Sequence, residues 1–224
     1  MRLLEPFYSA DEQLAIELPG ARAVFTTRAG GSAALSGNRE LLERRLGVRF
    51  AYGQQVHGAQ VRQTTVPGEA ASPAQVDGQA TATPGVGAMV LTADCLPIAI
   101  AGAGAVAMLH AGWRGLAAGV VEAGVRAVRE LGACGALVAA IGPGAGPCCY
   151  AVGDEVHTAF ATHGPRARRG GNLDLVAVAR LELERAGVSL VHDAGLCTIC
   201  SGLFFSHRRE RGITGRQAGI AWLI

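Results

Sequence analysis

The chain has 224 residues, of which 50% are hydrophobic and 17% are charged, so it can bury a sizeable core within one domain. Its formal net charge is only +2 and its basic residues form no runs, which argues against a nucleic-acid groove or an anionic membrane surface and favours a small ligand. All 20 basic residues are arginine, which excludes Schiff-base chemistry on a lysine and a lysine-dependent P-loop.

The N-terminal segment lacks the apolar region of a signal peptide, and no stretch of the sequence approaches the roughly 18 apolar residues of a membrane span. We therefore expect a cytoplasmic protein. Six cysteines are few for a disulfide-stapled fold of this size, and thiols stay reduced in the cytosol. We interpret them as packing, metal-binding or catalytic residues.

The first half of the chain alternates predicted strands and turns. A β-rich segment predicts a strand over residues 22–28, and Asn38 is expected to cap a helix that runs to Leu46 and ends at Gly47. Residues 55–61 and 88–92 are further predicted strands. Two apolar runs, 96–101 and 105–110, flank a glycine turn at 102–104 and predict a pair of buried strands.

The second half adds helices. Helical spacing predicts an amphipathic helix over residues 116–131 and another over 174–186, each ending at a glycine. Strands are expected at 136–141, 203–207 and 218–223, and exposed loops at 67–73 and 163–171. The sequence predicts an α/β (α+β) fold, a single domain over 1–224 with layered mixed sheets flanked by helices.

Two motifs suggest chemistry that their context does not favour. Residues 102–107 (GAGAVA) imitate a dinucleotide-binding fingerprint, but no helix follows them, so we favour a hairpin turn. Cys197 and Cys200 have CxxC spacing and, with Cys148 and Cys149, would supply four thiolates for a structural zinc. Adjacent cysteines chelate one ion poorly, so we favour small buried or loop thiols.

A stronger constellation comes from three segments, QQVHG (54–58), TADCLP (92–97) and HAGWRG (110–115), each with a histidine or cysteine near the end of a predicted strand. Imidazole and thiolate suit Zn²⁺ or copper, and three protein ligands leave a position open for water or substrate. From spacing alone, His57, Cys95 and His110 are either such a centre or separately packed residues. Asp94 would either orient a ligand imidazole or serve a turn.

At these residues the sequence resembles the laccase-domain (multicopper polyphenol oxidase-like) family, also known as purine nucleoside phosphorylase or peptidoglycan editing factor. The resemblance covers nearly the whole chain, in the order FTTRAGG, QQVHG, VDG, TADCLPI, HAGWRGL, IGPGAGPCCYAVGDEV, NLDL, CTICSGLFFSHRR and GRQAGIAW. It implies that His57, Cys95 and His110 bind zinc, with copper as the alternative. It also implies a layered α/β fold with mixed sheets.

The activity implied by the resemblance is phosphorolysis of adenosine, inosine and methylthioadenosine to base and ribose 1-phosphate, together with adenosine deamination. For deamination, water acidified by the metal would be the nucleophile and Asp94 the proton carrier. Phosphorolysis needs anion contacts, for which Arg28, Arg114 and Arg216 are the candidates, and the alternative for each is a structural arginine.

Two departures from the family pattern concern the pocket. Only AALSG separates Ser32 from Asn38, where relatives carry a longer loop, and Ala151 replaces a glutamate in the PCCYEVG-like motif. Three other functions remain open: a hydrolase of peptidoglycan precursors with Cys95 as nucleophile and His110 as base, a polyphenol oxidase, and a non-enzymatic binding module stabilised by metal.

Overall fold

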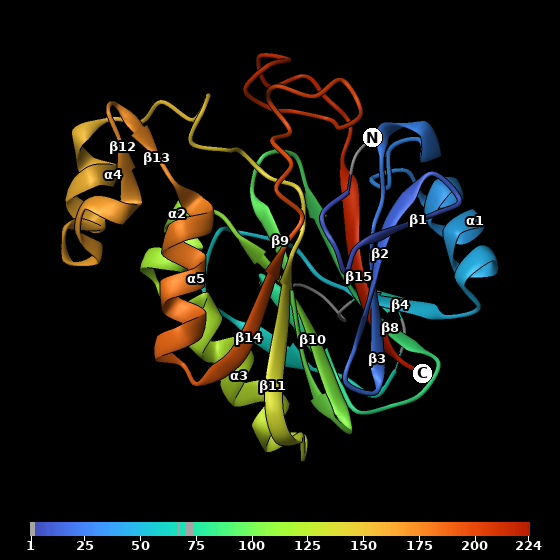
Figure 1. The fold of residues 1–224 in the computed structure, drawn as a ribbon. Helices are drawn as coiled ribbons and strands as arrows, with labels where there is room; N and C mark the ends of the chain where they lie inside the picture. Colours follow the sequence, from blue (N-terminus) through green and yellow to red (C-terminus); the bar gives the residue numbers. More distant parts are fainter. Residues whose placement is uncertain (1–2, 67, 70–73) are drawn as a thin grey trace.

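A computed structural model describes residues 3–66, 68–69 and 74–224. Two mixed sheets pack face to face at the centre of the molecule, and helices cover the outer face of each (Figure 1). The arrangement confirms the predicted layered α/β class with mixed sheets. No helix in this described part of the chain is long and apolar enough to cross a membrane.

The first sheet has seven strands in the order β1 (Tyr8–Ala10), β2 (Gln13–Leu18), β3 (Ala21–Phe25), β15 (Gln217–Leu223), β8 (Val86–Thr92), β4 (Arg49–Tyr52) and β6 (Gly68–Glu69). The pairs from β1 to β8 are antiparallel, and β4 is parallel to both of its neighbours. Helix α1 (Ser36–Leu46) contributes Leu42 to the apolar cluster on the outer face of this sheet.

The second sheet has six strands in the order β14 (Val188–Asp193), β11 (Cys134–Ile141), β9 (Leu96–Ala103), β10 (Ala105–Ala111), β7 (Gly78–Thr81) and β5 (Val61–Gln63). Helices α2 (Trp113–Ala117), α3 (Val120–Glu130) and α5 (Leu175–Arg185) pack on its outer face. The chain also forms α4 (Asp154–Ala159) and a small ribbon of β12 (Arg168–Arg169) and β13 (Asn172–Leu173).

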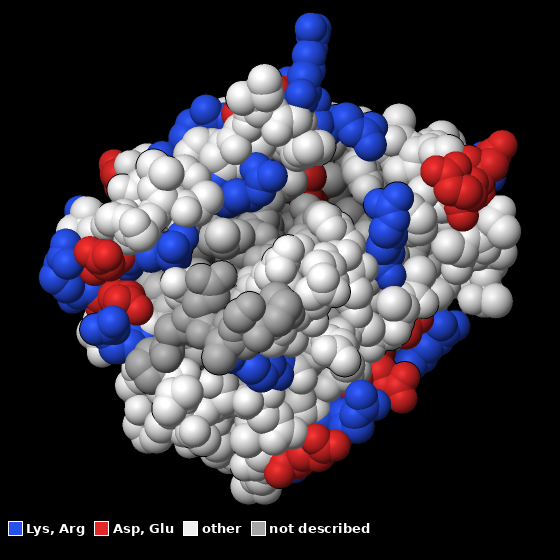
Figure 2. Space-filling model, turned by 180° about the vertical axis from the view of Figure 1, so that it is seen from behind, with Lys and Arg blue, Asp and Glu red and all other residues white. Residues whose placement is uncertain are grey.

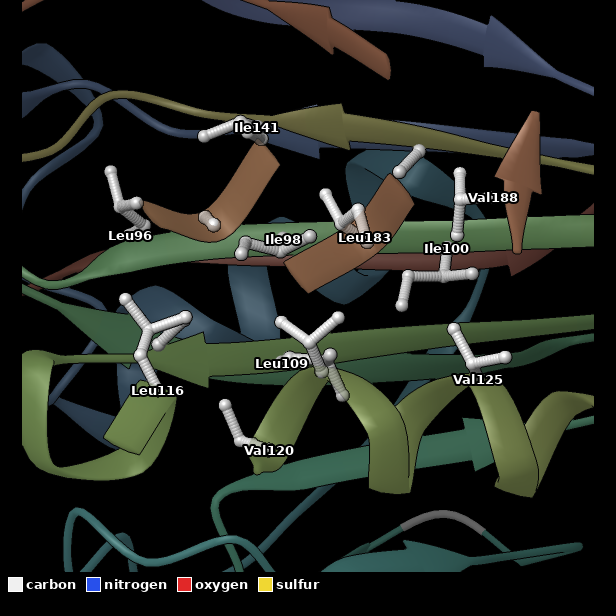
Figure 3. Packing of buried hydrophobic residues seen from close by; sticks show 14 of the residues in the cluster. Leu96, Ile98, Ile100, Leu109, Leu116, Val120, Val125, Ile141, Leu183 and Val188 are labelled. Atoms are coloured by element: carbon white, nitrogen blue, oxygen red, sulfur yellow. The ribbon is translucent and has the colours of Figure 1, made fainter. Parts of the chain in front are cut away.

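The central strands of the second sheet are apolar on both faces because both faces are covered. In β9, Leu96, Ile98 and Ile100 pack toward the helices, as Figure 3 shows, while Ala99 and Ala101 pack toward the other sheet. A strand buried on both faces lacks the polar alternation of a surface strand. This explains the continuous apolar runs in the sequence, which were predicted as buried strands.

The predicted turn at 102–104 is a hairpin between β9 and β10, with Gly104 at φ 95°, so the dinucleotide-binding alternative is wrong. The helix predicted over 116–131 is split into α2 and α3, because Gly119 adopts a left-handed conformation. Helix α5 begins as expected, with Asp174 accepting a hydrogen bond from the Ala177 amide at 3.0 Å.

Several local predictions are wrong. The segment predicted as an exposed loop at 163–171 contains most of a short 3-10 helix (Ala161–Ala167) and strand β12. Residues 203–207 form no strand and lie in an irregular segment between turns. Of the strand predicted over 55–61, only the last residue, Val61, is extended, as the start of β5. Helix α1 begins at Ser36 and not after Asn38, whose amide donates to the Ser32 carbonyl at 2.9 Å and closes the short loop before the helix. The loop predicted at 67–73 lies largely outside the described residues.

Candidate metal centre and cavity

The three predicted ligands meet at one point. One ligand atom each from His57, Cys95 and His110 lies within 4.8 Å of the others, and the two imidazole rings are 4.8 Å apart between centroids at 71°. Cys95 occupies the turn from β8 to β9, His110 lies near the end of β10, and His57 lies in the loop from β4 to β5. Gly112 gives them room, because a Cβ there would be 2.8 Å from the Cys95 sulfur.

Asp77 holds both histidines in place. Its fully buried carboxylate contacts His110 Nδ1 at 2.7 Å and accepts hydrogen bonds from the amides of Val56, His57 and Gly58 at 3.1, 2.9 and 2.7 Å. These three bonds support the loop in which His57 has a φ of 61°, a left-handed value that costs energy for a residue with a Cβ. With Nδ1 of His110 engaged, its Nε2 is left for the centre.

The charges of the site favour a bound cation. Burial would raise the pKa of Cys95, but hydrogen bonds from His110 and His57 outweigh burial and lower this pKa to about 6. Burial also opposes charge on His110, yet Asp77 and Cys95 raise its pKa to about 9. Burial would likewise raise the pKa of Asp77, and the His110 and Gly58 hydrogen bonds lower it instead. Cys95 is therefore a thiolate at neutral pH.

The donor set fits a metal. One thiolate and two imidazoles are the ligand types of zinc and copper, and the carboxylate behind His110 is the usual partner of a metal-binding histidine. Three protein ligands leave a coordination position open, as in catalytic sites. Residues His57, Cys95 and His110 could hold one ion at this point.

Asp94 does not orient a ligand imidazole, since Asp77 has that position. One Asp94 oxygen accepts a hydrogen bond from Thr198 Oγ1 at 2.6 Å and the other from the Arg208 amide at 2.7 Å. The Asp94 carboxylate thus ties the turn before Cys95 to two segments near the C-terminus. The VDG motif, residues 76–78, was the signal in the sequence that could have identified Asp77.

A cavity of about 780 Å³ opens from the three ligands. Basic groups share it with the candidate ligands, and Figure 2 shows basic side chains bordering a recess on one face of the molecule. Its lining comprises Ala34, Gly53, Gln55, His57, Leu91, Ala93, Asp94, Cys95, His110, Trp113, Arg114, Tyr150, His207, Arg208, Thr214 and Arg216.

The predicted arginines separate into two groups. Arg114 and Arg216 line the cavity, Arg114 with its guanidinium 4.4 Å from the Trp113 ring centroid. Arg28 does not line it: its guanidinium pairs with Glu210 and lies 4.6 Å from the Phe205 ring centroid. The structural interpretation therefore holds for Arg28, which we exclude from the site.

Two basic residues of the site were missed from the sequence. His207 and Arg208 belong to the quoted SHRR motif, and both line the cavity. The Arg208 guanidinium donates to the Ala151 carbonyl at 2.8 Å and lies 5.2 Å from the Tyr150 ring centroid. His207 is the last residue of the segment predicted as a strand, and a turn begins there instead, with the side chains of His207 and Arg208 in the cavity lining.

Both departures from the family pattern lie beside the cavity. The short segment after Ser32 places Ala34 in its lining. Ala151 is exposed next to Tyr150 and offers its carbonyl to Arg208. At position 151 the chain therefore presents no carboxylate to the arginines.

Four of the five remaining cysteines, those of the IGPGAGPCCY and CTIC motifs, also lie together. Sulfur atoms of Cys148, Cys149, Cys197 and Cys200 are within 4.8 Å of one another. The sulfur atoms of the adjacent Cys148 and Cys149 lie 3.3 and 2.8 Å from the Cys200 sulfur. Both side chains therefore point to the same place, which removes the objection that adjacent cysteines suit one ion poorly.

The fold and the site together define a class of two-sheet α/β proteins in which three candidate metal ligands converge where the chain passes between the sheets. The chain belongs to the family described as multi-copper polyphenol oxidoreductase laccase, whose model matches residues 24–224. The resemblance seen in the motifs is thereby confirmed.

Relatives and solved structures agree with this assignment. The chain is 41% identical to purine nucleoside phosphorylase SCO2081 of Streptomyces coelicolor, over 85% of this chain and 83% of the relative. It is 37% identical to purine nucleoside phosphorylase PA4543 of Pseudomonas aeruginosa, over 90% of this chain and 93% of that relative. The crystal structure of YlmD from Geobacillus stearothermophilus is similar with a TM-score of 0.84 and 33% identity, over 96% and 97% of the two chains.

Proposed function

We propose that the chain is a metal-dependent purine nucleoside phosphorylase that acts on adenosine, inosine and methylthioadenosine. The observation that carries the proposal is one cavity of about 780 Å³ that contains three convergent metal ligands and three arginines. This volume lies within the range of pockets that enclose small molecules. The two relatives named as purine nucleoside phosphorylases, at 41% and 37% identity, support the choice of substrate.

His57, Cys95 and His110 would hold the ion, which we propose to be zinc, with copper as the alternative. A zinc ion at such an open position supplies a Lewis acid and makes water a better nucleophile at neutral pH. This chemistry is the reason why the proposal includes adenosine deamination as a second activity. Asp77 keeps His110 in the tautomer that leaves Nε2 free.

Arg114, Arg208 and Arg216 are proposed to bind phosphate, because guanidinium groups form charge-assisted hydrogen bonds with its oxygens. In phosphorolysis a phosphate oxygen forms the bond to the anomeric carbon while the bond from that carbon to the purine nitrogen breaks. The electron pair leaves with the purine, which takes up a proton. Arginines that hold phosphate beside the sugar lower the entropic cost of this step.

The proton for the purine needs a donor in the cavity. Asp94 is a weaker candidate than the sequence suggested, since both of its oxygens already accept hydrogen bonds. We propose the imidazole of His207, which also lines the cavity, as the group that delivers the proton. Asp94 then acts as a positioning residue for Arg208.

The test is product analysis by mass spectrometry. Purified protein is incubated with each nucleoside, with and without phosphate, alongside His110→Ala and a Cys134→Ser control whose cysteine lies in neither cluster. The proposal expects ribose 1-phosphate, or 5-methylthioribose 1-phosphate from methylthioadenosine, only when phosphate is present. It expects loss of this product in His110→Ala and full activity in Cys134→Ser. Formation of ribose 1-phosphate at an unchanged rate by His110→Ala would overturn the metal-dependent mechanism.

A Cys95-dependent hydrolase acting on peptidoglycan precursors is the second candidate. It is favoured by one observation, a thiolate beside a charged imidazole, which is the pairing that activates a nucleophilic cysteine. Chelation and alkylation separate the two candidates. Hydrolysis of such a precursor that survives chelation and stops on alkylation of Cys95 would favour the hydrolase.

A further inference from the structure

A second cluster of potential metal ligands lies outside the cavity described above. It consists of Cys148 and Cys149, in the loop after β11, and Cys197 and Cys200, in the loop after β14. Strands β11 and β14 are parallel neighbours, so the two loops leave the same end of the sheet. We propose that these four cysteines, called the thiol cluster below, bind one structural zinc ion.

The distances between the sulfur atoms support one shared ion. All four lie within 4.8 Å of one another, and Cys200 is 2.8 Å from Cys149 and 3.3 Å from Cys148. In a tetrahedral site with zinc–sulfur bonds of about 2.3 Å, the sulfurs are separated by about 3.8 Å. Small movements of the side chains therefore suffice to reach this geometry. Four thiolates are the closed ligand set of structural zinc.

Backbone hydrogen bonds already prepare the site. The amide of Gly146 donates to the Cys197 sulfur at 3.2 Å, an interaction that stabilises a thiolate. Gly146 also provides space, because a Cβ there would lie 3.3 Å from the sulfurs of both Cys148 and Cys197. The two loops are joined independently of the sulfurs, with the Thr198 amide donating to the Gly144 carbonyl at 2.9 Å.

Four thiolates so close together repel one another, so most of these thiols keep their protons unless a cation lies between them. Burial would raise the pKa of Cys197, but amide hydrogen bonds from Cys200 and Gly146 lower it. The Cys200 contact raises the pKa of Cys148 to about 11, and the Cys149 contact raises that of Cys200 to about 11. A divalent cation at the centre reverses this, because it favours deprotonation of each thiol that ligates it.

The thiol cluster is connected to the cavity by short paths. Tyr150, which follows Cys149, lines the cavity, and Thr198, which lies between Cys197 and Cys200, donates to Asp94. An ion in the cluster would therefore fix both loops at the cavity wall. The proposal does not depend on the nucleoside substrate or on the function of the first centre.

The experiment compares zinc content by elemental mass spectrometry in protein purified without chelator. Cys197→Ser and Cys149→Ser are each expected to contain about one zinc ion per chain less than wild type and the Cys134→Ser control. His110→Ala removes a ligand of the first centre only and is expected to retain the ion of the thiol cluster. X-ray absorption at the zinc edge of His110→Ala is then expected to show a first shell of sulfur alone.

Two results would overturn the proposal. One is a His110→Ala protein that contains no zinc, binds none when zinc is added and has four freely reactive thiols in this cluster. The other is a disulfide among the four cysteines, detected by mass spectrometry in protein purified without reductant. If the serine variants do not fold, cobalt added to His110→Ala provides the test, since four thiolates give intense charge-transfer bands that a nitrogen or oxygen site lacks.

Discussion

Asp77 links the two histidines of the candidate metal centre through a single buried carboxylate. One oxygen contacts the His110 ring, and together the two oxygens accept three amides of the loop that carries His57. A partner of this kind fixes the tautomer and the direction of the ligand ring. The centre is therefore set by a residue that is not itself a ligand.

Replacing Asp77 by Asn is expected to weaken zinc binding roughly 10–100-fold. The asparagine amide has no negative charge, and only one of its two polar atoms can accept hydrogen bonds, whereas both Asp77 oxygens do so. Competition with a chromogenic chelator measures the affinity. Thr64→Ser, a buried change away from the ligands, is a matched control and should leave the affinity unchanged. An Asp77→Asn protein with wild-type affinity would refute the orienting role.

The charges of Cys95 and His110 predict that metal binding releases protons. At pH 7.5 Cys95, with a pKa of about 6, has lost its proton, whereas His110, with a pKa of about 9, still carries one. Zinc requires both groups deprotonated, so binding should release about one proton from this pair, and affinity should rise as the pH increases toward 9. Calorimetry in buffers of different ionisation enthalpy measures the release in a Cys197→Ser background, and zinc binding without net proton release would contradict these charges.

At the scale of elements, the contact between α3 and β10 depends on a glycine. Gly124 lies on the buried face of α3, where a Cβ would be 2.6 Å from a methyl carbon of Leu109. The absence of a side chain lets the helix approach β10, the strand that carries His110. Helix packing and placement of a ligand are therefore coupled in this part of the fold.

Gly124→Ala should lower the free energy of unfolding by about 1–3 kcal/mol, since the added methyl overpacks this contact. Gly37→Ala is the matched control: it is also helical, but its Cβ would meet nothing within 4 Å, so it should be neutral or stabilising by up to about 1 kcal/mol. Urea denaturation measures both. Equal effects of the two changes would contradict the packing argument.

For the molecule as a whole, the candidate metal centre lies where the chain crosses between the sheets. Cys95 is in the turn from β8 of the first sheet to β9 of the second, and His57 is in the connection from β4 to β5. An ion bound by both therefore joins the two crossings to His110 on the second sheet. It would bind the folded chain and not the unfolded one.

Zinc added at 100 times its Kd should stabilise the fold by about 2.7 kcal/mol, which corresponds to a rise in Tm of roughly 5–10 °C for a chain of this size. The thiol cluster would add its own effect, so the comparison is made in a Cys197→Ser background. There, the shift should disappear when His110→Ala is added. Persistence of the full shift in the double variant would show that this centre does not bind the ion.

The sequence by itself determined the layered α/β class, the buried hairpin and the glycine-terminated helices, because these follow from local periodicity and turn chemistry. Its ordered motifs also identified the family. The structure alone decided that Asp77 orients His110, that Arg208 lines the cavity and Arg28 does not, and that four distant thiols meet. Such contacts join residues far apart in the sequence, so only the packing of the two sheets and their loops determines them.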